Sequence, residues 1–133
     1  MTLYSKRKKS FAAEMRLMMT YFAAFDGSQS WDDIEPVVDA TLHADLAVLQ
    51  GKETFDLQQF KQKLQTFVSA GGFMEVHKLK QQPLGIQYHV TFHKPNNDSK
   101  DDMMFTTKSL GTFQDGKLIR VQRDNVRRAN AIL

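Results

Sequence analysis

Residues 55–72 read FDLQQFKQKLQTFVSAGG and divide the chain into a helical part and a strand part. Asp56, followed by Gln59 three residues later, fits the capping box that begins a helix. Apolar residues then recur with a period of about 3.6, and the pair Gly71 and Gly72 ends the helix. Its predicted buried stripe consists of Leu57, Phe60, Leu64 and Phe67.

Two more helices and one strand are predicted before this point. The first helix has apolar residues at alternating steps of four and three, and Gly27 ends it. These apolar residues are Phe11, Met15, Met18, Phe22 and Phe25. Ser30, with Asp33 three residues later, predicts the capping box of a second helix, whose middle is disturbed by Pro36. The short apolar run at residues 46–49 predicts a strand.

After residue 72 every periodic segment has a period of two, which is typical of half-buried strands. Asp115 and Gly116 join the last two of these strands as an antiparallel hairpin. The four predicted strands are residues 73–79, 86–93, 103–113 and 117–123.

The predicted order is helix, helix, strand, helix and four strands, which is an α+β pattern. We expect three N-terminal helices packed on one face of a curved, mostly antiparallel sheet. A chain of 133 residues with 41% hydrophobic residues forms one core. We therefore expect a single domain over residues 11–133, preceded by a basic N-terminal extension at residues 1–10.

Three stretches are similar to those by which SnoaL-like members of the nuclear transport factor 2-like superfamily are recognised. They are YFAAFDG at residues 21–27, LHAD at residues 42–45 and DGKLIR at residues 115–120. The resemblance implies a cone-shaped roll, in which the sheet wraps around the first helix and encloses a cavity. Members of the superfamily include isomerases, cyclases, dehydratases, epoxide hydrolases and transport factors, so the fold leaves the function open.

The ketosteroid isomerases in this superfamily have a tyrosine and a protonated acid as an oxyanion hole and a second acid as the base. By resemblance the tyrosine corresponds to Tyr21. The base position falls near Gln50, which cannot accept a proton at neutral pH, and the acid position falls near Ser109, a weaker polariser. The sequence therefore gives no secure catalytic base, and whether the protein is an enzyme stays open.

The register of the last hairpin determines which side chains face the cone. A three-residue turn with a bulge at Gly116 sends Ile119 inward and keeps Lys108 out of the core, whereas a two-residue turn buries that charge. We expect the bulged turn, and with it a cone suited to a small, largely apolar ligand with one polar end. The predicted cavity lining includes Tyr21, Phe22, Tyr88, Val90, Phe92, Ser109, Val121 and Arg123. The same side chains are also compatible with a closed core.

Polar residues of the predicted sheet gather on the face turned away from the cone. We expect this outer face to form the interface of a homodimer, through His77, His89, Thr91 and His93. We expect His77 and His89 to be cross-strand neighbours, and Glu75 could join them. A metal site is nevertheless not expected, because histidines on a face turned away from the cavity more often contribute to an interface or contact solvent. His43 with Asp45 predicts a cap and turn.

Several classes of protein are excluded by composition or by missing motifs. The chain has no cysteine, which excludes disulfides, thiolate nucleophiles and iron–sulfur clusters and favours a cytoplasmic location. No apolar run approaches the ~18 to 20 residues of a membrane span, so we expect no membrane partner. The basic residues near the two ends lack interleaved aromatics, which argues against nucleic-acid binding. No phosphate-cradling glycine loop is present, and no cofactor is predicted.

Three hypotheses about function remain. The first is a domain that binds a small apolar ligand in its cone. The second is an enzyme of the cyclase, isomerase or dehydratase type, acting on a polyketide-like or terpenoid-like compound. The third is a dimeric interaction module with a closed core.

Overall fold

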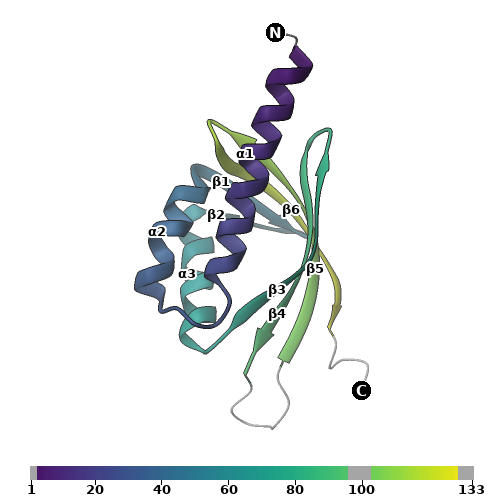
Figure 1. Cartoon of the computed structure of the whole chain (residues 1–133). Coiled ribbons are helices and arrows are strands. Elements are labelled where there is room, and N and C mark those ends of the chain that lie inside the picture. Colours follow the sequence, from purple (N-terminus) through teal and green to yellow (C-terminus); the bar gives the residue numbers. More distant parts are fainter. Residues whose placement is uncertain (1–2, 96–102, 129–133) are drawn as a thin grey trace.

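A computed structural model describes residues 3–95 and 103–128, with side chains for residues 11–95 and 104–124. It contains three helices and six strands in its described part (Figure 1). In chain order they are α1 (Leu3–Ala24), α2 (Trp31–Thr41), β1 (Leu42–Gln50), β2 (Glu53–Asp56), α3 (Leu57–Ser69), β3 (Phe73–Gln82), β4 (Gly85–Lys94), β5 (Met103–Gln114) and β6 (Lys117–Arg128). No helix within the described ranges is long and apolar enough to cross a membrane.

The six strands form one curved sheet in the order β2-β1-β6-β5-β4-β3. β1 and β6 run parallel, and all other neighbouring strands are antiparallel. The three helices lie on one side of the sheet (Figure 1). We call this side the inner face and the opposite side the outer face. The predicted α+β fold, with helices on one face of a mostly antiparallel sheet, is confirmed.

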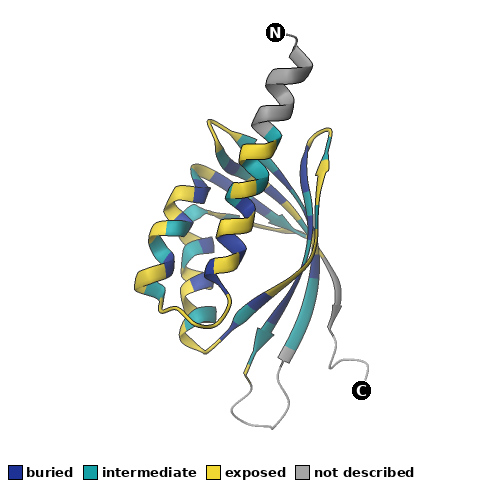
Figure 2. Cartoon of the chain, in the orientation of Figure 1, coloured by how far each residue is buried: buried dark blue, intermediate teal, exposed yellow. Residues whose placement is uncertain are grey.

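The core lies between the helices and the inner face, where Figure 2 shows most of the buried residues. Alternating residues of the central strands point into it, because successive side chains of a strand lie on opposite faces. The largest side chains that are fully buried are Met18, Phe25, Ile34, Val38, Val48, Ile86, Val90 and Val121.

Helix α1 is longer than the sequence predicted. Its apolar stripe is buried as expected at Met18, Phe22 and Phe25, and Gly27 follows with a φ of 92° that favours glycine. The helix begins at Leu3, however, rather than at residue 11. Lys and Arg are good helix formers, which explains why the backbone of the basic segment at residues 6–9 continues the helix. The side chains of that segment lie outside the described residues.

Helix α3 begins with the predicted capping box. The Gln59 amide donates to Asp56 Oδ1 at 2.8 Å, and the Asp56 amide donates to Gln59 Oε1 at 3.0 Å.

The capping box predicted for α2 is wrong, because its hydrogen bonds are not formed. Ser30 occupies the N-cap position, but its hydroxyl donates to the Asp33 carboxylate at 3.1 Å and does not accept from the helix.

Strand β2 was missing from the sequence-based order. Residues Glu53–Asp56 form a short hairpin with β1, in which Phe55 is opposite Val48. The strand has only four residues and only one of them, Phe55, is half-buried, so it carries no alternating pattern of its own. β1 is also longer than the predicted run at residues 46–49, because it starts directly at the end of α2.

The last hairpin has a different turn from the one predicted, but beyond the turn its side chains point to the predicted faces of the sheet. Asp115 and Gly116 have φ angles of 55° and 77° and form a two-residue turn, not a three-residue one. The bulge lies further along β6, at Ile119, which is the extra residue between two ladder pairs. Leu118 is therefore buried in place of Ile119. Beyond the bulge the register is the expected one, and Lys108 stays exposed.

Candidate functional site

One row of side chains crosses the inner face from the edge strand β3 to β1, next to the opposite edge. Residues that are directly opposite one another in neighbouring strands point to the same face. Five such residues follow one another across β3, β4, β5, β6 and β1. They are Leu79, Tyr88, Ser109, Arg123 and Gln50. Of these, the sequence predicted Tyr88, Ser109 and Arg123 as cavity residues.

Helix α1 adds a second tyrosine to this row. Tyr21 is 4% exposed, and its ring centroid lies 5.2 Å from that of Phe22 and 5.0 Å from that of Phe25. The Phe22 ring in turn lies 5.2 Å from the Tyr88 ring. The two residues predicted on α1 are thus placed against the middle of the row.

Several polar atoms at this place are buried without a hydrogen-bond partner. They include Thr107 Oγ1, Ser109 Oγ and Arg123 Nε. Thr107 neighbours the row on β5, where it is opposite Val90, and is 0% exposed. Within the described part of the chain, the Tyr21 hydroxyl makes no hydrogen bond either. An unpaired buried polar group costs about 1 to 3 kcal/mol of stability, so this cluster is an expensive arrangement for a structural core.

Arg123 carries the only charge of this cluster. Its guanidinium carbon lies 5.3 Å from the centroid of the Phe60 ring and 5.1 Å from that of Phe92. Both are attractive cation–π contacts. No carboxylate among the described residues approaches the guanidinium within 4.0 Å. Arg123 is therefore a half-buried cation held by aromatic rings and not by an ion pair.

Both tyrosines are neutral in this environment. Burial raises the pKa of Tyr21 well above its ordinary value, Tyr88 adds to the rise, and the charge of Arg123 opposes it. Burial also raises the pKa of Tyr88, against the opposing effects of Arg123 and the Ser109 hydroxyl. Ser109 is near enough to act on Tyr88, but its oxygen does not reach hydrogen-bonding geometry. At neutral pH the site therefore offers hydroxyl donors beside a guanidinium.

An apolar groove opens beside this row, between α1 and β3. Its volume is about 610 Å³, and its lining is Met15, Met19, Phe22, Ala23, Asp26, Met74, Val76 and Leu79. Met19 is 58% exposed and Val76 37% exposed, which is high for large apolar side chains. Phe22 lines the groove and contacts Tyr88, so it separates the groove from the polar cluster. The groove was not predicted from the sequence, because β3 is an edge strand and only the tertiary packing of α1 against it leaves this opening.

A second opening reaches Arg123 from the other end of the row. It has a volume of about 500 Å³ and lies at the turn between β1 and β2. Its lining is Gln50, Gly51, Lys52, Glu53, Arg123 and Asp124. Arg123 thus contacts the aromatic core on one side and an open pocket on the other.

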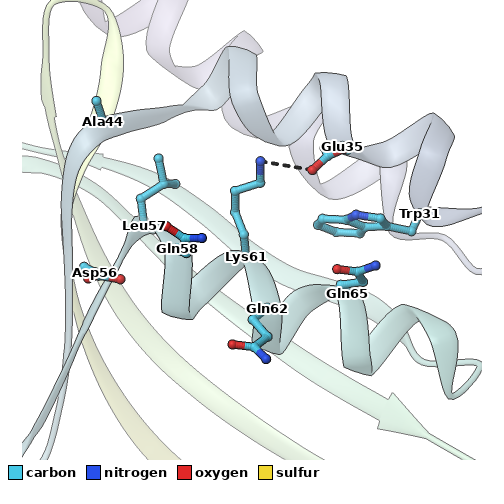
Figure 3. Close-up of a pocket in the computed structure, with 9 residues that line it drawn as sticks. All are labelled: Trp31, Glu35, Ala44, Asp56, Leu57, Gln58, Lys61, Gln62 and Gln65. Carbon is cyan, nitrogen blue, oxygen red and sulfur yellow. Dashed lines mark ion pairs between the residues drawn. The ribbon is translucent and has the colours of Figure 1, made fainter.

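A larger and more polar groove, of about 750 Å³, lies between α2, α3 and the start of β1 (Figure 3). Lys61 at its centre is already paired, at 3.1 Å from Glu35 and 2.8 Å from Asp39. The lining glutamines are exposed, and Trp31 packs at the edge of the core. The lysine of this groove is already paired at the surface, so we place the candidate site on the inner face instead.

The outer-face histidines are partly engaged within the chain. His77 Nε2 lies 2.6 Å from the Thr91 hydroxyl, and His93 Nε2 lies 2.9 Å from Glu75. A bulge in β3 places Lys78, and not His77, opposite His89. The expectation that His77 and His89 are direct cross-strand neighbours is therefore wrong. His89 Nε2 is buried without a partner. No group of three metal-binding side chains occurs among the described residues.

The chemistry open to this site follows from the groups that it lacks. Among the described residues, no Asp, Glu or His is buried. Gln50 at the end of the row cannot act as a base, as expected from the sequence. The buried part of the inner face can therefore bind and polarise an oxygen atom, and the carboxylate of the groove lining, Asp26, is exposed.

No protein-family model and no curated protein sequence matches the chain. Solved structures do resemble it. One is AclR from Streptomyces galilaeus, a candidate hydroxylase, with a TM-score of 0.73 and 11% identity over 92% of this chain and 95% of that one. Another is an LEH-like epoxide hydrolase from M. tuberculosis, with a TM-score of 0.68 and 14% identity over 86% and 84% of the two chains. A candidate SnoaL-like polyketide cyclase from Jannaschia sp. CCS1 has a TM-score of 0.67 and 12% identity over 86% of each chain.

Proposed function

We propose that this chain, which has the SnoaL-like form of the nuclear transport factor 2-like fold, binds a small and largely apolar molecule on the inner face of its sheet. The observation that carries the proposal is the apolar groove between α1 and β3. It exposes side chains of the inner face that a closed core would bury, among them Val76 and Leu79.

The groove has the properties of a small-molecule site. Its volume of about 610 Å³ is within the range of roughly 300 to 1,000 Å³ that such sites have. Three methionines line it, and their flexible side chains adapt to irregular apolar ligands. The polar groups of the neighbouring row supply the few oriented contacts that fix such a ligand. For the ligand to reach them, the Phe22 ring has to move away from Tyr88.

An enzymatic role is the less supported alternative. Proteins described as polyketide cyclases and as an epoxide hydrolase share this fold. A fold shared at 14% identity or less does not carry an activity with it. A cyclase, isomerase or dehydratase reaction would also require an acid or base, which the buried described residues do not include.

The proposal is tested with N-phenyl-1-naphthylamine, an uncharged apolar fluorophore. We expect saturable binding to the wild type, and weaker binding to Leu79→Gln, because the polar amide loses roughly 1.5 to 3 kcal/mol of apolar burial. Leu84→Gln is the matched control, since Leu84 is 74% exposed in the β3–β4 turn and outside the groove. A wild type that does not bind the probe, or equal effects of the two variants, would refute the proposal.

We further propose that the outer face forms a homodimer through His77, His89, Thr91 and His93. The histidines of this face support the dimer, because their rings combine an apolar body with a polar tip. A stable interface of this kind buries about 1,200 to 2,000 Å². Sedimentation at micromolar concentration tests it, and a monomer alone at that concentration would rule the dimer out.

A further inference from the structure

We infer that the ligand ends in a carboxylate, which Arg123 binds together with the hydroxyls of Ser109 and Tyr88. This inference rests on the proposed function, because it names the chemical class of the molecule that enters the groove. The row that crosses the inner face then has one apolar end, at Leu79, and one anion-binding end, at Arg123.

The first argument is the charge of Arg123. A guanidinium keeps its proton at any pH in which the protein folds, so it cannot lower its cost of burial by becoming neutral. A partly buried cation is normally compensated by an anion. Here no carboxylate of the described residues lies within 4.0 Å of it. The compensating anion is therefore absent from the described chain and present on the ligand.

The second argument is Ser109, which has a buried hydroxyl without a partner beside this charge. Ser109 is opposite Arg123 in the β5–β6 ladder and opposite Tyr88 in the β4–β5 ladder. A water molecule or a neutral ligand would satisfy the hydroxyl groups, but neither would compensate the guanidinium. A carboxylate does both, because its two oxygens accept about four hydrogen bonds and pair with a guanidinium through two parallel ones.

The third argument is the placement of the guanidinium. Phe60 and Phe92 contact it from the core, while Gln50, Lys52 and neighbouring residues form an open pocket around it. The aromatic contacts fix its position and reduce the entropy lost when a carboxylate binds. Lys52 adds a second positive charge to the lining of that pocket, and Glu53 and Asp124 add two negative charges, neither of which lies within 4.0 Å of the guanidinium.

The size of the ligand follows from the row. Leu79 and Arg123 are three strand spacings apart, which is roughly 14 Å at about 4.8 Å per spacing. A medium-chain fatty acid, or another apolar molecule of similar length with one carboxylate, spans this distance. Its apolar body would lie against Phe22 and Leu79 and its charged end against Arg123.

The test compares decanoate with decanamide, which has the same chain and a neutral end. Displacement of N-phenyl-1-naphthylamine at pH 8 measures both affinities. We expect the wild type to bind decanoate about 10- to 100-fold more tightly than decanamide, because a charge-assisted pair of hydrogen bonds contributes a difference in affinity of this size. Arg123→Gln is expected to lose most of this preference, because it lowers the affinity for decanoate far more than the affinity for decanamide. Arg120→Gln, an exposed residue on the same strand, makes the same change in charge and retains the preference.

The outcomes separate the inference from the proposed function. Equal affinity of the wild type for the two compounds overturns the carboxylate and leaves the apolar site standing. If neither compound nor the fluorophore binds, the proposed function itself fails. If Arg123→Gln still prefers decanoate to decanamide, another residue binds the carboxylate and the inference is overturned. Should Arg123→Gln not fold, Arg123→Lys decides, because it keeps the charge but loses the paired hydrogen bonds. Its affinity for decanoate is expected to fall several-fold, and an unchanged affinity refutes the role of Arg123.

Discussion

Thr107→Val should make the protein more stable, although it changes a polar residue in the middle of the sheet. Thr107 lies on β5 and is 0% exposed, and its Oγ1 has no hydrogen-bond partner. Valine has nearly the same shape, is favoured in strands, and replaces the hydroxyl by a methyl group that has nothing to lose on burial. The substitution therefore removes an unpaired polar atom and leaves the packing in place.

The size of the effect follows from the cost of that atom. A buried hydroxyl without a partner costs about 1 to 3 kcal/mol, so the free energy of unfolding should rise by about that amount. For a domain of this length, 1 kcal/mol corresponds to roughly 4 °C in Tm. The variant should therefore melt about 4 to 12 °C above the wild type. In urea, its midpoint should shift upward with an unchanged slope, because the surface exposed on unfolding is the same.

Thr91→Val is the matched control, one strand away and on the outer face. Thr91 is also buried, but its hydroxyl lies 2.6 Å from His77 Nε2 and 2.8 Å from the Thr106 hydroxyl. The same chemical change should therefore lower stability there, by about 1 to 3 kcal/mol, since it leaves two partners unsatisfied. Opposite signs for the two variants are the expected result.

A destabilised Thr107→Val would refute the reasoning, because it would mean that the hydroxyl is bonded in the folded protein. If the variant is more stable and also binds the apolar probe less well, the Thr107 hydroxyl contributes to ligand binding and lowers the stability of the folded protein. Such an exchange between stability and binding is common at functional sites.

Three further predictions concern single residues. Tyr21→Phe should leave Tm almost unchanged and weaken ligand binding by about 0.5 to 1.5 kcal/mol, because its hydroxyl has no partner among the described residues; a Tm several degrees lower would show that it has one. Phe60→Ala should lower the free energy of unfolding by roughly 3 to 5 kcal/mol, since Phe60 is buried in the core stripe of α3, and a loss under about 1 kcal/mol in urea titrations would contradict this. Burial, helped by Lys78 and Lys108, lowers the pKa of His89, so the folded state favours the neutral ring. Stability should therefore fall as the pH drops below about 6.5, and His89→Gln should reduce that dependence in melts between pH 7 and 5.

Local signals predicted the individual elements well. The capping box at Asp56 and Gln59 is made by neighbours in sequence, so it needs no tertiary information. The alternation along β4 likewise placed Tyr88 on the inner face, because the period of two is a property of the strand itself. Ser109 and Arg123 were placed on this face through the bulged turn expected at Gly116, whereas the structure reaches the same face with a two-residue turn and a bulge at Ile119.

The parts that were missed depend on contacts between distant segments. β2 is too short and too exposed to have a pattern, and it exists because β1 offers it a partner. The extra residue of the last hairpin was expected in the turn at Gly116, but it lies in β6 at Ile119. Both positions give the same register further along the strands, so no local pattern in the sequence distinguishes them. The lack of partners around Arg123 is a property of the whole inner face. It could only be found once Phe60, Phe92 and the strands had been placed around it.

The parallel pairing of β1 with β6 also has a consequence for how the chain comes to be folded. It joins Val48 to Val121, so β1 can pair along this edge only after a segment far later in the sequence has been synthesised. Until then β1 has only the four-residue β2 as a neighbour, and its backbone groups are open to pairing with other chains. Contacts between segments so far apart in sequence slow folding. The pairing that completes the sheet also brings Arg123 beside Gln50, so the row on the inner face is complete only when the sheet is complete.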